Sequence, residues 1–318
     1  MRQAIRLAFA MQRLELRLLL AAVLLVSVAA LGIAWQTRVL REAQLACLES
    51  APPAVEGSVE SPCPGQDEPL ATLDRLSAFA KMGVIFTPIV LGLFLGVPLV
   101  AREIESRTAP LAWSLSRSRR RWLLQRAVPV FGVIALACIA VGVAGDVLAH
   151  APPWVEGSDP GFEDWWARGP QVAVHGVAIA AAGMAIGAIV GRQLPALLLG
   201  GVATLALFVA VTLVDDALMR SAVEPIAVGP NQLVTGKIYG SGFRQDASGR
   251  LLSDEEGYAL FGDQLDESGY PPPGYSMVYY LVPSRRYGEF AVYDAAMFGT
   301  VAAAGMALAS WIVVRRRP

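Results

Sequence analysis

Six stretches of 18 to 20 residues that contain no Asp, Glu, Lys or Arg limit what this chain can fold into. About 20 apolar residues in a helix cross the hydrocarbon core of a bilayer, roughly 30 Å thick, because a helix satisfies its own backbone hydrogen bonds where no water is present. We therefore predict an all-α integral membrane protein with six transmembrane helices. The predicted spans are residues 18–35, 82–101, 127–145, 172–191, 195–214 and 295–314.

The composition excludes most other classes. Apolar residues make up 55% of the chain, charged residues 17%, and the mean hydropathy is +0.49. A net charge of -1 and three cysteines argue against a nucleic-acid-binding arm and a disulfide-dense secreted module. The sequence lacks a Walker phosphate loop, an H-E-x-x-H pair, a metal-spaced Cys cluster and a Ser elbow. We expect no enzyme activity, cofactor, metal or nucleic-acid partner.

The arginines predict the orientation. With a cytoplasmic N-terminus, the inner segments hold 15 of the 26 basic residues and three of the 27 acidic ones. Basic residues in short loops favour the cytoplasmic side, so we expect both termini to be cytoplasmic and residues 215–294, between helices 5 and 6, to form a long extracellular loop. All seven tryptophans fall at predicted span boundaries, where their amphipathic rings prefer to lie.

The first 17 residues place Arg2, Arg6, Arg13 and Arg17 on one helical face, which indicates an amphipathic helix on the inner leaflet. A plain basic flank that only fixes topology is the alternative. A cleaved signal peptide is a further alternative for the first span. We expect that span to be retained, because its 18 apolar residues exceed the usual signal length and continue into a helical pattern.

Three cysteines and two histidines carry the remaining side-chain chemistry. Cys47 and Cys63 both lie in the first predicted outer loop, where they form a disulfide or remain free thiols. Cys138, inside the third span, indicates a small packing residue. His150 follows Asp146 by four residues, which fits a solvated pair better than an ion site. The spans lack acidic and basic residues, and this disfavours an ion-coupled carrier.

Residues 215–294 are long enough for a structured cap and contain all eight tyrosines. A capping box from Ser253 to Glu256 predicts one short helix, and "GYPPPGY" predicts an extended turn. The aromatic residues fit interfacial anchors or the core of the cap, and a substrate vestibule is the alternative. In the fourth span, Gly183, Gly187 and Gly191 share one face and predict close helix packing.

The predicted loop of residues 102–126 contains seven arginines, and around residues 110–115 it predicts a short amphipathic helix. Together with the end of the second span it reads "LGVPLVAREIESRTAPLAWSLSRSRRRW", and this stretch resembles the permeases of ABC type-2 exporters, especially those of high-GC Gram-positive bacteria. The stretches "FEDWWARGPQVAVHGVAIAAAGMAIGAIVGRQLPA" and "YYLVPSRRYGEFAVYDAAMF" are also similar to that family. Arg107 stands where the family usually has Gly, in an expected tight turn. The matching positions are Glu103, Glu105, Thr108, Leu111, Ala112, Trp113, Ser118, Arg119, Arg121 and Trp122.

The resemblance implies that this loop couples the spans to a separate ABC ATP-binding subunit. It further implies two permease copies, identical or different, and an amphiphilic or apolar substrate moved outward across the bacterial plasma membrane. The domains expected are residues 1–17, the spans of 18–214, the cap of 215–294, and 295–318 with the sixth helix and basic tail. The alternative is a non-transporting scaffold or sensor whose extracellular cap binds a ligand. A membrane-embedded enzyme has no supporting motif.

Overall fold

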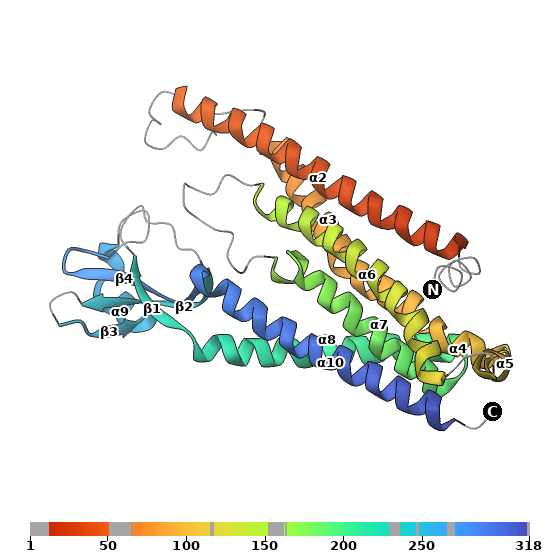
Figure 1. Ribbon diagram of the computed structural model, residues 1–318. Helices are drawn as coiled ribbons and strands as arrows, with labels where there is room; N and C mark the ends of the chain where they lie inside the picture. The colour runs from red at the N-terminus through yellow and green to blue at the C-terminus, as the bar shows by residue number, and fades with distance from the viewer. Residues whose placement is uncertain are drawn as a thin grey trace. The chain divides into compact units, whose positions relative to one another are not determined.

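The computed structural model describes residues 13–50, 65, 67–114, 118–151, 162, 164–228, 236–245, 248–265 and 271–316 (Figure 1). The chain divides into two compact units. Unit 1 contains residues 1–153, 166–210 and 293–318, and unit 2 contains residues 154–165 and 211–292. The chain passes from unit 1 to unit 2 within α8 and returns within α10.

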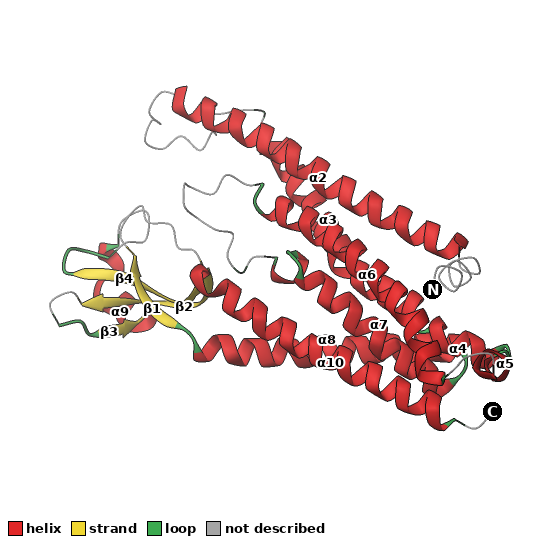
Figure 2. Ribbon diagram, in the orientation of Figure 1, coloured by secondary structure: helices red, strands yellow, loops and turns green. Residues whose placement is uncertain are grey.

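Helices form the whole of unit 1 that the structure describes (Figure 2). α3 and α4 are separated only by Val97, and Pro98 occupies the first position of α4, where its missing N–H breaks no helical hydrogen bond. The helices are α2 (Arg13–Ser50), α3 (Asp67–Gly96), α4 (Pro98–Glu105), α5 (Ala109–Ser114), α6 (Arg119–Ala149), the 3-10 turn η1 (Trp165–Ala167), α7 (Gln171–Val190), α8 (Gln193–Ser221) and α10 (Tyr287–Arg315).

The prediction of six membrane-spanning helices is confirmed: six helices are long and apolar enough to cross a bilayer. Several are longer than their predicted apolar cores. α8 continues to Ser221 and α10 begins at Tyr287, so the segment between them is shorter than the predicted cap of 215–294. Arg13 and Arg17 belong to α2, whereas residues 1–12 lie outside the described residues. The predicted short helix around 110–115 is present as α5.

The core of unit 1 lies where α3, α6 and α7 meet. Val84 and Leu91 of α3, Ile134 of α6 and Met184 of α7 belong to one buried apolar cluster. α3 and α7 are the most buried spans, whereas α2 and α8 expose most of their apolar side chains. This exposed apolar surface is what lipid tails cover around a membrane protein.

Two of the three glycines predicted to pack on α7 do so against the junction of α3 and α4. A Cβ atom on Gly187 would lie 2.6 Å from the carbonyl oxygen of Val97, and one on Gly183 would lie 3.1 Å from a methyl carbon of Val97. Gly191 ends α7 in the left-handed conformation with φ 67°, and a Cβ atom on it would also lie 2.9 Å from a methyl carbon of Ile104 in α4. Gly191 therefore combines close packing with a helix cap, a position for which glycine is preferred.

Unit 2 corrects the all-α prediction, because it contains an antiparallel four-stranded sheet in the order β1-β4-β2-β3 (Figure 2). A short helix and two 3-10 turns accompany the sheet. The elements are β1 (Glu224–Val228), β2 (Gly236–Gln245), β3 (Leu251–Ser253), α9 (Asp254–Phe261), η2 (Gly262–Gln264), β4 (Tyr275–Pro283) and η3 (Ser284–Arg286). An open sheet edge has unpaired backbone groups, which exclude it from the hydrocarbon region.

The predicted capping box is confirmed and begins α9. The Ser253 side chain accepts from the Glu256 backbone, and the Glu256 carboxylate accepts from the Ser253 backbone. Behind this helix, Phe243, Leu252 and Phe261 form a small buried core. The rings of Tyr258 and Tyr275 contact this core, but Tyr258 is 55% exposed, so the role expected for the tyrosines stays a prediction.

Candidate functional site

The candidate site begins at the turn between α4 and α5. The Thr108 N–H donates to the carbonyl of Glu103, and the Arg107 N–H donates to the carbonyl of Ile104. This pair of bonds is a Schellman motif, whose penultimate residue adopts the left-handed conformation that glycine prefers. Arg107 adopts that conformation with φ 59°. The tight turn therefore forms even though arginine replaces the usual glycine.

Glu103 holds this turn to α6. Its carboxylate accepts a hydrogen bond of 2.7 Å from the Thr108 hydroxyl, and its other oxygen forms an ion pair with Arg126. The Glu103 side chain is only 13% exposed and that of Arg126 30%. Such partial burial makes the ion pair more persistent than one on an open surface, where screening and side-chain entropy remove most of its effect.

Two buried tryptophans lie between two arginines beside this ion pair. Trp113 of α5 and Trp122 of α6 meet edge to face, with ring centroids 6.2 Å apart. The guanidinium of Arg119 lies 4.6 Å from the Trp113 centroid, and that of Arg126 lies 4.8 Å from the Trp122 centroid. Cation–π attraction thus joins both ends of the aromatic pair to charged groups.

Arg119 and Arg316 then connect this network to two other helices. Arg119 donates to the last carbonyls of α10, at 3.3 Å to Val313 and 3.2 Å to Val314. Arg316 donates to the carbonyl of Ala188 near the end of α7. The last carbonyls of a helix lack intrahelical partners and carry partial negative charge, so both arginines stabilise helix ends.

Glu105 provides a separate connection, from α4 to α8. Its carboxylate accepts a hydrogen bond of 2.9 Å from the backbone N–H of Gln193, the first residue of α8. A carboxylate at this position satisfies a free amide and complements the positive end of the helix dipole. A residue of one helix therefore caps another that lies almost 90 positions later in the chain.

The exposed side chains of the segment differ in chemistry from those of the buried network. Leu111 is 64% exposed on α5, and Arg107, Arg120 and Arg121 are also exposed. Ser118 is the N-cap of α6, and its hydroxyl accepts from the Arg121 backbone. The surface consequently combines one apolar side chain with several positive charges. We call residues 98–126 the coupling segment, of which 115–117 lie outside the described residues.

The sequence matches a family model described as ABC-2 membrane transporter related, over residues 18–220. The chain belongs to this family. The match includes α2 to α8 and the whole coupling segment, and it identifies a multi-pass membrane protein of the transporter class. Among curated proteins, no match is found.

Most coupling residues expected from the family resemblance lie in one network. Glu103 and Thr108 are joined by a hydrogen bond. Trp113 is joined to Trp122 by an aromatic contact and to Arg119 by a cation–π contact. Glu105 and Arg121 lie outside that network. Sequence reasoning missed Arg126 and Arg316. Arg126 follows Trp122 by four residues, a spacing that places both on one helix face, so that signal was present.

The network also changes the role expected for the arginines of this loop. The family resemblance implies a loop whose arginines can pair with acidic groups of a soluble partner. Arg119 instead binds the carbonyls of α10 and Arg126 binds Glu103, so both are engaged within the chain. Arg120 and Arg121 are exposed, and their pairing with a soluble partner stays a prediction.

Other predicted sites have mixed outcomes. Cys47 is disulfide-bonded and Cys138 is free and buried, but Cys63 lies outside the described residues, so the Cys47–Cys63 pairing stays a prediction. Asp146 lies 3.8 Å from the His150 ring nitrogen, and it also accepts a hydrogen bond of 3.0 Å from Arg168. The Asp146 and His150 side chains are both more than 40% exposed, as expected for a solvated pair.

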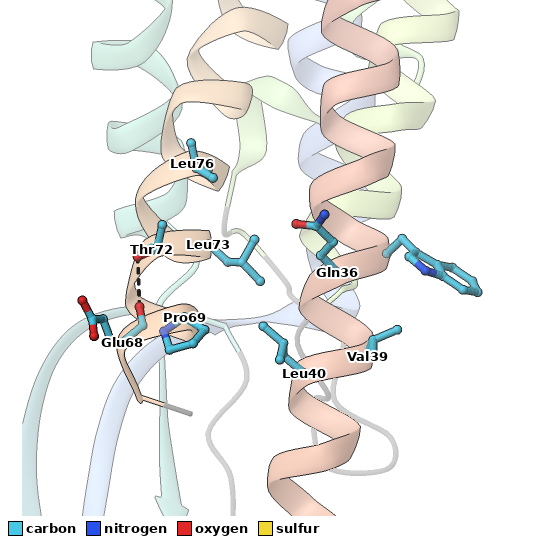
Figure 3. Close-up of a pocket in the computed structure, with 9 residues that line it drawn as sticks. Gln36, Val39, Leu40, Glu68, Pro69, Thr72, Leu73 and Leu76 are labelled. Atoms are coloured by element: carbon cyan, nitrogen blue, oxygen red, sulfur yellow. Dashed lines mark hydrogen bonds between the residues drawn. The ribbon is translucent and has the colours of Figure 1, made fainter. Parts of the chain in front are cut away.

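A groove of about 540 Å³ separates α2 from α3 (Figure 3). Apolar side chains from both helices form most of its walls, and the polar residues are Gln36, Glu68 and Thr72. The Thr72 hydroxyl donates back to the Glu68 carbonyl. The lining residues are Trp35, Gln36, Val39, Leu40, Glu68, Pro69, Thr72, Leu73 and Leu76. A lipid acyl chain fits such walls as well as any other apolar solute, so the groove identifies no substrate class.

The prediction that the spans lack ionisable residues is wrong for one buried pair. His175 of α7 and Asp294 of α10 are paired at 2.7 Å, and their side chains are 1% and 0% exposed. Asp294 falls one residue before the predicted sixth span, but α10 begins seven residues earlier, at Tyr287. The hydropathy limit therefore placed a buried carboxylate outside the helix to which it belongs.

Proposed function

We propose that this protein is the membrane-spanning permease subunit of an ATP-binding cassette exporter. It moves an amphiphilic or apolar substrate outward and is driven by ATP that a separate ATP-binding subunit hydrolyses. The observation that carries this proposal is the hydrogen-bonded and cation–π network of the coupling segment. It connects α4 and α5 to α6 and α10, while Glu105 connects α4 to α8.

The orientation belongs to the same proposal. The coupling segment, Arg192 and the basic end of α10 face the cytoplasm of a bacterial cell, where a soluble ATPase is available. Unit 2 is extracellular. Two permease copies enclose the substrate path, and each has its own coupling segment. An amphiphilic or apolar substrate fits spans that contain no Asp, Glu, Lys or Arg better than a charged one does.

The network distinguishes residues that bind the ATPase from residues that transmit its movement to the membrane helices. The exposed Leu111 and Arg121 lie on the side of the segment that a soluble partner can reach, and we assign them to docking. Arg119 and Glu103 are engaged within the chain, so we assign them to passing a displacement of α5 on to α6 and α10. A shared packed network of this kind allows two sites to bias one another.

The test co-expresses the chain with candidate ABC ATPases and measures both capture of the ATPase and its stimulated hydrolysis. Leu111→Glu combined with Arg121→Glu is expected to abolish capture. Arg119→Ala and Glu103→Gln are expected to retain capture and to reduce stimulation about 10-fold, an estimate that corresponds to roughly 1.4 kcal/mol of lost coupling.

The control is Arg75→Ala, which removes an exposed arginine of α3 away from the segment and is expected to change neither quantity. A chain that captures no ABC ATPase in its native membrane contradicts the permease assignment. If Arg119→Ala abolishes capture as strongly as the Leu111 and Arg121 substitutions do, the separation of docking from transmission is wrong.

A further inference from the structure

α10 contacts α7 at separate points along its length. Asp294 and Gly305 are 11 positions apart, close to three helical turns, so they share one face of α10, and Arg316 follows 11 positions later, directly after the end of the helix. The two helices run in the same direction through these contacts. In chain order, the contacts are Asp294 and Phe298 with His175, Gly305 with Ala181, and Arg316 with the carbonyl of Ala188.

Glycine and alanine form the middle of this contact. A Cβ atom on Gly305 would lie 2.7 Å from the carbonyl carbon of Ala181, so the two backbones approach closely with no side chain between them. Ala178, Ala181, Ala185 and Ala188 of α7 are all buried. Small residues permit close approach but provide no large side chain that fits into a partner's surface. Ala309 and Val313 of α10 are buried in the same apolar cluster as Ala185 and Ala188, and the directional polar contacts between α10 and α7 lie at the two ends.

At one end stands the His175–Asp294 pair. Rings of Trp166, Phe208 and Phe298 surround the imidazole, with centroids 4.2 to 6.0 Å from it. Among the described residues, none provides a hydrogen-bond partner for Nδ1 of His175 or for Oδ1 of Asp294. Burying such a pair is expensive, and apolar side chains of similar volume are often equally or more stabilising. Stability alone therefore does not explain the pair.

At the other end stand the arginines. Arg119 holds the last carbonyls of α10, and Arg316 holds the end of α7. Because the Arg119 guanidinium also lies over the Trp113 ring of α5, a displacement of α5 is passed to α10 at this end. The far end of the same helix is held by the hydrogen bond between Nε2 of His175 and Oδ2 of Asp294, which are 2.7 Å apart. Because a hydrogen bond is directional, this bond forms in only one position of α10 on α7.

We propose that His175 and Asp294 are positioning residues that fix the axial register of α10 on α7. With the register fixed, a displacement of the C-terminal end of α10 is transmitted along the whole helix. When the pair is replaced by apolar side chains, α10 adopts several registers on the smooth alanine face. The transmission step rests on the function proposed above, whereas the register itself does not.

The experiment measures the register in the full chain in lipid nanodiscs, without an ATPase. Spin labels are attached to Ile189→Cys on α7 and Leu308→Cys on α10, two exposed positions, with Cys138→Ala to remove the free thiol. Labelled chain is diluted into unlabelled chain so that only distances within one chain contribute. Double electron–electron resonance is expected to give one narrow distance distribution for the parent.

The deciding variant is His175→Leu with Asp294→Val. We expect thermal stability equal to or above that of the parent and a distribution broadened by roughly 5 Å, about one helical turn. Asp294→Asn keeps a hydrogen bond to His175 and is expected to restore the narrow distribution. His150→Leu, at the solvated pair, is the matched control and should change nothing.

Three outcomes overturn the proposal: a stable double variant with a narrow distribution, a double variant that fails to fold, or a broad distribution for Asp294→Asn. The second would mean that the pair acts through stability. A chain that captures no ATPase would contradict the proposed function and leave these distance measurements intact, so the two failures are distinguishable.

Discussion

Arg107 is the residue at which local strain is clearest. Its φ of 59° places an L side chain in the left-handed region, which costs roughly 1–2 kcal/mol relative to glycine. Arg107→Gly is therefore expected to raise the free energy of unfolding by about 1 kcal/mol, reduced somewhat by the extra freedom of glycine in the unfolded chain. Chemical unfolding of the purified protein measures this. Arg107→Ala removes the same charge and keeps the strain, so an equal gain with alanine would refute the explanation.

Single residues also show which parts of the site can be predicted from the sequence and which cannot. Glu103, Thr108 and Trp113 could be selected because neighbouring residues in the chain form a motif. The His175–Asp294 pair could not, since 119 residues separate its members and a lone buried histidine has no periodic signal. Arg119 itself could be selected, but its acceptors could not, because backbone carbonyls of α10 leave no mark on the sequence of that helix.

At the scale of elements, the link between α4 and α8 gives the clearest test. Glu105→Ala removes the carboxylate that caps α8, which is expected to cost about 1 kcal/mol and to loosen the first turn of that helix. Glu105→Gln keeps an acceptor oxygen and should have a smaller effect. Hydrogen exchange in a peptide covering residues 192–197 reports the change. Glu42→Ala, an exposed substitution on α2, is the control, and equal exchange in all three variants would contradict the cap.

The elements themselves were unequally predictable. Six spans follow from hydropathy because lipid requires long apolar helices, and α9 follows from its capping box. The sheet of unit 2 was missed, although "YSMVYYLVP" in β4 has the aromatic and β-branched content of a strand. β2 contains three glycines and a bulge, and β3 has only three residues, so neither has an alternating pattern.

At the scale of the whole molecule, everything proposed depends on which side of the membrane the coupling segment faces. The described arginines of this segment lie in α4, α6 and the turns beside them, and unit 2 contains an open sheet that hydrocarbon does not accept. An even number of spans predicts that both termini lie on one side. The excess of arginine near the predicted inner ends predicts that this side is the cytoplasm.

Labelling of single cysteines in intact cells tests this orientation, again with Cys138→Ala. Ser248→Cys, in an exposed turn of unit 2, is expected to react with a membrane-impermeant maleimide in intact cells. Arg121→Cys, at the exposed start of α6, is expected to react only after permeabilisation. The order is a physical consequence of arginine retention on the inner side. If Arg121→Cys reacted in intact cells and Ser248→Cys did not, a cytoplasmic ATPase could not reach Leu111, and the docking surface would have to be sought in unit 2.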